Sequence, residues 1–188
     1  MFLENILVHL IKLLLMFFII MLTGCVSNPL NQVTSERYSE MCAKYENAGD
    51  YYSAEQACYR AYVNTEWGNL DNELKSQKLY NLARVKRPLS KFAEAESLLK
   101  NSLKIEKSLK KTNQVRIGRR SVELAVNYAA QDKWIEALET IKTVIPIISK
   151  YSQSEQNYIF TVLNHFGEHF NEVGNHEEAE FLKNITKG

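Results

Sequence analysis

Proline and glycine are scarce in this 188-residue sequence, which contains three prolines and seven glycines. Because these residues punctuate chains built from many short strands, their scarcity favours long helices. Low-complexity segments, a glycine-rich phosphate loop and a Gly-x-Ser-x-Gly nucleophile elbow are all missing, and no pair of carboxylates stands out. We therefore expect an all-α protein that is not an enzyme and binds no cofactor and no small-molecule substrate.

One long apolar run interrupts this composition, near the N-terminus. The ten residues Leu13 to Leu22 read LLLMFFIIML and follow Lys12. Crossing a bilayer takes about 20 apolar residues, so the run is short for a membrane span. A charged start followed by such a run is typical of a secretory signal peptide, which we place at residues 1–24. The residues before the run are also largely apolar, and an uncleaved membrane anchor is the alternative.

The residues that close the run read Leu-Thr-Gly-Cys, ending at Cys25. This tetrapeptide resembles the bacterial lipobox. The resemblance implies cleavage before Cys25, diacylglycerol on its thiol and a fatty acid such as palmitate on the new amino group. Valine and serine follow the cysteine, and no aspartate is there to retain the protein at the inner membrane. We expect residues 25–34 to form the lipidated cysteine and a tether, at the outer membrane facing the periplasm.

A pattern of small residues recurs four times in residues 35–188. Its alanines are spaced by 41, 42 and 42 residues, at Ala54, Ala95, Ala137 and Ala179. Upstream of each alanine, apolar residues at three- and four-residue steps form one stripe of a helix. Each stripe includes a small residue that lets a partner helix approach closely, at Cys42, Ala83, Ala125 and Gly167. The sequence therefore predicts four helical hairpins.

The hairpin pattern resembles the tetratricopeptide repeat (TPR), with Tyr38, Tyr45, Gly49, Ala54 and Ala61 in place in the first repeat. The period of about 42 residues is similar to that of kinesin light chains. This resemblance implies a solenoid of four repeats and eight helices over residues 35–188, with a concave face. The expected helices are 35–48, 51–66, 71–87, 91–111, 114–131, 133–150, 153–173 and 175–186.

Charge is distributed unevenly along the expected solenoid. Residues 74–120 carry 14 basic and 3 acidic groups, whereas residues 35–73 carry 3 and 8, and residues 155–188 carry 2 and 6. The family lines its concave groove with the exposed face of each first helix. On that analogy, the residues that face the groove are Asn81, Arg84, Arg87, Arg119 and Asn164. The alternative, which applies above all to the lysines, is a solvated outer face.

These features predict a membrane-anchored scaffold that binds a peptide or protein. Arginines suit carboxylates, so an acidic peptide or protein is the expected partner, with anionic lipid head groups as the alternative. Basic patches often bind nucleic acid, but export argues against that partner. Two further functions stay open, which are a pilotin-like assembly factor for a secretion or pilus component and a non-catalytic regulator of cell-wall enzymes.

Two smaller motifs each have a chemical and a structural interpretation. His165 to His169 spell H-x-x-E-H, a zinc-peptidase motif, but apolar neighbours commit this helix to a core and no third ligand is evident, so we expect no metal. Cys42 and Cys58 are expected on the two helices of the first hairpin. An oxidising compartment allows a disulfide between them, and the alternative is a pair of small buried thiols.

Overall fold

The structure is a computed structural model that describes His9, Lys12 and residues 27–187. Cys25, the expected lipidation site, and nearly all of the expected signal peptide lie outside the described residues. Among the helices that are described, none has both the length and the hydropathy to cross a bilayer.

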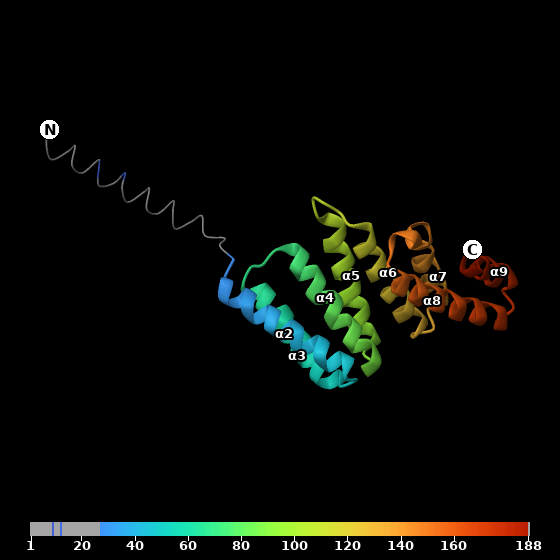
Figure 1. Ribbon diagram of the computed structural model, residues 1–188, viewed down its shortest axis with the longest axis horizontal. Helices are drawn as coiled ribbons and strands as arrows, with labels where there is room; N and C mark the ends of the chain where they lie inside the picture. Colours follow the sequence, from blue (N-terminus) through green and yellow to red (C-terminus); the bar gives the residue numbers. More distant parts are fainter. Residues whose placement is uncertain (1–8, 10–11, 13–26, 188) are drawn as a thin grey trace.

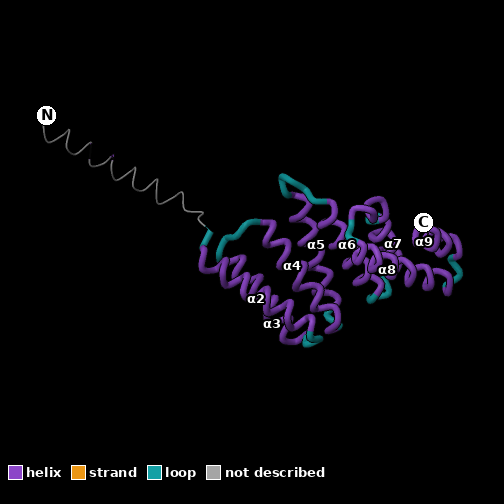
Figure 2. Tube along the Cα trace, in the orientation of Figure 1, coloured by secondary structure: helices purple, strands orange, loops and turns teal. Residues whose placement is uncertain are grey.

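Every regular element in the described part of the chain is a helix, which confirms the all-α prediction (Figure 2). Eight α-helices and two short 3-10 helices (η1 and η2) follow one another there. They are α2 (Pro29–Asn47), α3 (Tyr51–Trp67), α4 (Asn72–Lys86), η1 (Arg87–Leu89), α5 (Phe92–Ser108), α6 (Gln114–Ala129), α7 (Trp134–Lys142), η2 (Ile145–Lys150), α8 (Gln153–Glu172) and α9 (His176–Lys187).

The helices pair as the hairpins α2–α3, α4–α5, α6–α7 and α8–α9, which stack along the long axis of the molecule (Figure 1). Each hairpin turn contains one residue in the left-handed region, at Gly49, Ser90, Asp132 and Gly174. Five residues later comes the repeated alanine, which is 0% exposed in the first three hairpins. The four-repeat solenoid predicted from the alanine spacing is therefore present.

Two helix ends differ from the expected spans by more than five residues, one because of a cap and one because of a proline. Helix α2 begins at Pro29, inside the segment expected to be a tether. The Asn28 side chain accepts a hydrogen bond from the Leu30 N–H (3.0 Å), and proline suits the first helical position. Helix α7 already ends at Lys142, short of the expected residue 150, because the ring of Pro146 and its missing N–H prevent the α-helix from continuing, and Pro146 is instead the second residue of η2.

The hydrophobic core consists of two clusters. The larger cluster runs through the second, third and fourth hairpins and contains the large side chains Leu99, Ile141 and Phe166. The smaller one joins the first hairpin to α4 and is built mostly from small residues, namely Cys42, Ala54, Ala57, Cys58, Leu82 and Val85. The first hairpin is therefore attached through a smaller apolar contact than the others.

Candidate functional site

A groove of about 590 Å³ crosses α4, α6 and α8, the first helices of the last three hairpins. The end of α2 and the start of α3 close one side of it. Most of its lining residues are arginines, glutamates and tyrosines, namely Arg84, Arg87, Arg119, Arg120, Glu46, Glu123, Glu155, Tyr51, Tyr80, Tyr151 and Tyr158. Such a lining presents charged guanidinium groups and flat aromatic rings to one ligand.

Arginines of the groove are bound to glutamates from neighbouring repeats. Arg84 contacts Glu46 at 2.5 Å, and Arg87 contacts Glu123 at 2.9 Å. Two hydrogen bonds lower the pKa of Glu155 to about 2, and the one from Arg119 has a larger effect than the one from a serine at the start of α8. These pairs hold the guanidinium groups in fixed positions along the groove.

The tyrosines provide the apolar part of the lining. Burial raises the pKa of Tyr80 and of Tyr151 to about 12, so both rings stay neutral. The guanidinium of Arg84 lies 5.6 Å from the Tyr80 ring centre. Tyr158 is 42% exposed, and its hydroxyl donates to Glu123 at 3.2 Å. The ring of Tyr158 is thus available to a ligand while its hydroxyl is fixed.

A second, apolar hollow of about 330 Å³ adjoins the groove, because Arg87 and Tyr158 line both. Trp134, Val162 and Phe166 form much of its wall. The Arg87 Nε atom is buried and has no hydrogen-bond partner among the described residues. The two hollows form one continuous surface, which shares Arg87 and Tyr158.

The structure places three of the five predicted groove residues in the groove, which are Arg84, Arg87 and Arg119. Asn81 does not line it, and its Oδ1 accepts a hydrogen bond from a glutamine within α4 at 2.8 Å. Asn164 lies in a separate hollow between α8 and α9, where it accepts a hydrogen bond from a threonine of α9 at 2.9 Å. The expectation for these two asparagines is therefore corrected.

The positive charge of residues 74–120 is not concentrated in the groove. Four of the 14 basic residues line it, beside three glutamates. Five others form ion pairs elsewhere. Four lysines are exposed in the last turns of α5 and the loop that follows, at Lys104, Lys107, Lys110 and Lys111. The groove is therefore mixed in charge, and most of the basic residues of this segment lie outside it.

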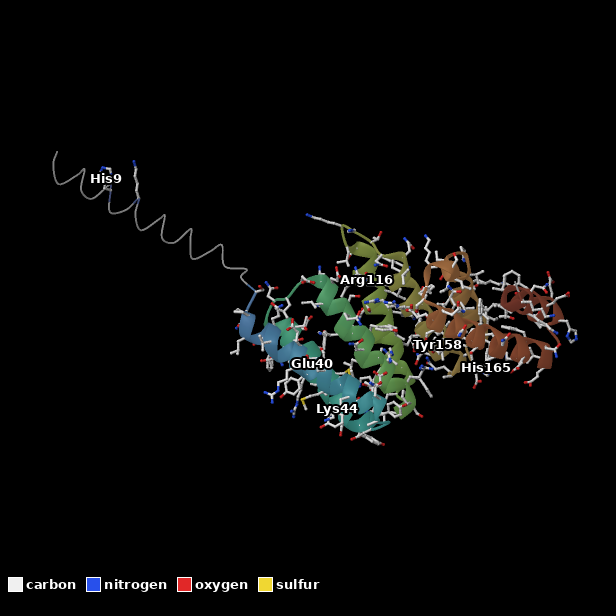
Figure 3. All side chains as sticks on the ribbon, viewed as in Figure 1. His9, Glu40, Lys44, Arg116, Tyr158 and His165 are labelled. Carbon is white, nitrogen blue, oxygen red and sulfur yellow. A yellow bond between two sulfur atoms is a disulfide. The ribbon has the colours of Figure 1, made fainter. Side chains whose placement is uncertain are left out.

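The histidines of the H-x-x-E-H motif pack against Trp134. The His169 ring is stacked on the indole, with centroids 3.5 Å apart, and His165 lies at 5.8 Å. Figure 3 shows His165 near Tyr158, which comes from the same helix. In the described part of the chain, no three histidine, cysteine or acidic side chains are arranged to hold a metal ion.

Cys42 and Cys58 face each other between α2 and α3 and are joined by a disulfide, with Cα atoms 5.1 Å apart. Both are 2% exposed. The geometry therefore fits the bonded alternative, and the redox state in cells stays a prediction.

The tyrosines and glutamates of the groove were not predicted from the sequence. One further lining residue, Gln77, could have been predicted, since it stands one 42-residue period before Arg119. No comparable signal marks Tyr151, which follows η2 and lies outside the first helices.

No protein-family model and no curated protein matches the sequence. Solved structures do resemble the chain. The nearly identical TPR-like repeats of a putative kinesin light chain from Podosopora anserina share 20% identity, with a TM-score of 0.62 over 81% of this chain and 73% of that one. BtubC (BKLC) from P. vanneervenii shares 18% identity, with a TM-score of 0.71 over 84% of this chain and 63% of that one. At such identities the likeness shows the fold, which is a TPR-like helical-repeat solenoid.

Proposed function

We propose that this chain is a membrane-anchored scaffold whose groove binds a peptide segment of a protein partner. The observation that carries the proposal is the continuous lining of paired arginines and tyrosines across three repeats. Tyrosine gives contact area at low entropic cost, and arginine binds carboxylates through two parallel hydrogen bonds. The proposal includes no catalytic step and no cofactor.

The partner segment that fits this lining is acidic and also carries a large apolar side chain. Its carboxylates replace Glu46 or Glu155 on the arginines, and its apolar side chain enters the hollow beside Trp134. Because the arginines are already held in place, little ordering entropy opposes the exchange of one carboxylate for another. Since exposed charge attraction is screened within about 8 Å at physiological salt, binding weakens as salt rises.

The location belongs to the same proposal. The Leu-Thr-Gly-Cys motif behind an apolar run supports lipid on Cys25. Two or more acyl chains give stable anchoring, at about 0.8 kcal/mol per buried CH₂. The absence of aspartate after the cysteine supports the outer membrane, with the scaffold in the periplasm.

Replacing Cys25 by serine is expected to abolish lipid labelling and to leave the leader uncleaved, because serine has no thiol to acylate. Feeding cells a clickable fatty acid and measuring the intact mass of the protein tests this. Wild-type protein that takes up no fatty acid and keeps its leader would end the lipoprotein proposal.

The double substitution Arg84→Gln/Arg119→Gln is expected to weaken partner binding about 100-fold or more, since each of the two hydrogen bonds to a charged group contributes about 1.5–3 kcal/mol. This variant is a better test than the charge reversal Arg84→Glu/Arg87→Glu. Both arginines were expected to be exposed, but Arg87 has a buried Nε and is bound to the buried Glu123, so a glutamate there would destabilise the site.

The partner is first captured from cells with a photo-crosslinking residue in place of Tyr158. Its affinity is then titrated against wild type, the groove variant and the control Lys100→Gln/Lys142→Gln, at two salt concentrations. The control removes two part-exposed, ion-paired cations outside the groove. Affinity that is equal in all three proteins would contradict the groove proposal.

A further inference from the structure

One edge of the described solenoid carries exposed lysines in excess of its acidic groups. We propose that this edge is a second interaction surface, which binds the anionic phospholipid head groups of the membrane that holds the anchor. The proposal rests on the lipid anchor of the proposed function for its geometry, and the charges of the edge are an independent observation.

Two contacts place the start of α2 on this edge, which we call the anchor edge. The Asn28 N–H donates to the Gly68 carbonyl at 2.9 Å and joins the start of α2 to the end of α3. The ion pair of Glu66 with Lys75, at 2.7 Å, then joins the end of α3 to the start of α4. The first two hairpins thus contribute adjacent helix ends to one side of the molecule.

Further contacts extend the anchor edge along the solenoid. Arg116, at the start of α6, binds Glu73 at the start of α4 and Glu106 at the end of α5. The Tyr151 hydroxyl donates to the Val115 carbonyl at 3.2 Å, which brings the start of α8 beside that of α6. Figure 1 shows the start of α4, the end of α5 and the start of α6 toward the upper side of the molecule and the turns of the first two hairpins toward the lower side, and Figure 3 labels Arg116 in the upper half of the folded part.

The anchor edge has an excess of lysine. Its acidic groups Glu66, Glu73 and Glu155 are each bound to a cation, and Asp71 caps α4. Five exposed lysines at or near this edge form no ion pair with another described residue, and they are Lys104, Lys107, Lys110, Lys111 and Lys150.

The opposite edge, where the hairpins turn, has the reverse charge. Asp50 caps α3 there, and the exposed acidic side chains without a cap or an ion pair among the described residues are Asp132, Glu136, Glu172 and Glu177. Lys44 also lies there, toward the lower margin of Figure 3. The molecule is therefore polarised across its width, and an anionic surface attracts the anchor edge and repels the opposite one.

The anchor holds the start of α2, which belongs to this edge, within range of such a surface. Three residue steps separate Cys25 from Asn28, and a chain of that length reaches about 10 Å when extended. This length is comparable to the Debye length of about 8 Å at physiological salt. Each lysine near an anionic surface favours the membrane-facing orientation about fivefold, so two of them favour it about 25-fold. The anchored scaffold is therefore expected to lie with its lysines on the head groups.

The test uses the full chain purified from membranes and reconstituted into phosphatidylcholine vesicles, with or without phosphatidylglycerol. A cysteine replaces Thr112 in the α5–α6 loop or, as a control, Ala48 in the first hairpin turn, and carries a fluorophore quenched by nitroxide head groups. On anionic vesicles we expect strong quenching at position 112 and weak quenching at position 48. On neutral vesicles we expect little difference between the two positions.

The substitution Lys110→Gln/Lys111→Gln is expected to remove most of the extra quenching at position 112. The control Lys44→Gln/Lys133→Gln removes two lysines from the opposite edge, in the last turn of α2 and at the N-cap of α7, and should leave the quenching unchanged. Equal quenching at the two positions on anionic vesicles, or none lost in the first variant, would overturn the proposal.

Flotation with neutral vesicles tests the lipid anchor separately from the lysine edge, because binding to neutral vesicles depends on the acyl chains of the anchor alone. Protein that floats on neutral vesicles but shows equal quenching at positions 112 and 48 on anionic ones would keep the anchor and reject the lysine edge. Protein that fails to float on neutral vesicles, yet binds anionic ones through these lysines, would reject the anchor and keep the edge.

Discussion

Replacing Glu106 by methionine is expected to lower the free energy of unfolding by about 3–5 kcal/mol, as removal of one partner from a buried ion pair does. Glu106 is 0% exposed and Arg120 is 1% exposed, and their side chains lie 3.3 Å apart. Without Glu106, the guanidinium of Arg120 stays buried and loses its carboxylate partner. The substitution therefore leaves an uncompensated charge in the seam between the second and third hairpins.

Neighbouring hydroxyls show that this seam is built around the arginine. The Arg120 Nε donates to Ser102 at 2.7 Å and to Ser76 at 3.1 Å. Ser76 in turn donates to Glu106 at 3.1 Å. Because α4, α5 and α6 each contribute to the network, its loss weakens the stacking of two hairpins as well as one ion pair.

The double substitution Glu106→Met/Arg120→Met is expected to cost clearly less than the sum of the two single ones, since an apolar pair of similar size leaves no buried charge. Urea unfolding followed by circular dichroism measures all three. The matched control is Glu178→Met, which breaks the part-exposed pair with Lys142 and should cost about 1 kcal/mol or less. Additive losses of that small size at positions 106 and 120 would contradict the prediction.

The sequence predicted the hairpins well because their determinants are local and periodic. Ala54, Ala95 and Ala137 are fully buried at the helix contacts that their spacing indicated. The helix ends were less predictable, since a single residue decides them. The Asn28 cap lengthened α2 into the expected tether, and α7 ended before Pro146.

The groove could be predicted only in part, because its character depends on contacts between repeats. Arg84, Arg87 and Arg119 lie on or directly after first helices, and the family resemblance pointed to them. Their glutamate partners are 36 to 38 residues away in sequence, so a count of charges cannot reveal the pairing. Asn164 was misplaced because the groove covers only the first half of α8, and this residue lies farther along the helix, in the separate hollow between α8 and α9.

Loss of the Cys42–Cys58 disulfide is expected to act on the first hairpin alone. This hairpin packs through a small cluster of cysteines, alanines, Leu82 and Val85, whereas the other three hairpins share the larger core. In a solenoid, each repeat is stabilised by its own contacts and by its neighbours, so a weak terminal repeat can unfold separately. The bond therefore stabilises the repeat that has the least apolar contact of its own.

The bond links residues 16 apart in sequence, and closing a loop of that size contributes about 3 kcal/mol on the chain-entropy account. The substitution Cys42→Ala/Cys58→Ala keeps small apolar side chains at both positions, so most of its expected cost is the lost cross-link. That cost corresponds to α2 and α3 opening about a hundredfold more often in hydrogen exchange, while amides in α6 and α8 keep wild-type protection.

Reductant should produce the same pattern in the wild type and no further change in the variant. Protein taken from cells and alkylated without reductant tests whether the bond exists there, because two labelled thiols after denaturation would refute it.

Helix α2 begins at Pro29, four residues after Cys25, so the disulfide hairpin is the part of the fold that connects the proposed lipid to the groove. Reduction should therefore loosen the scaffold next to its anchor, and uniform loss of protection across all four hairpins would contradict this account.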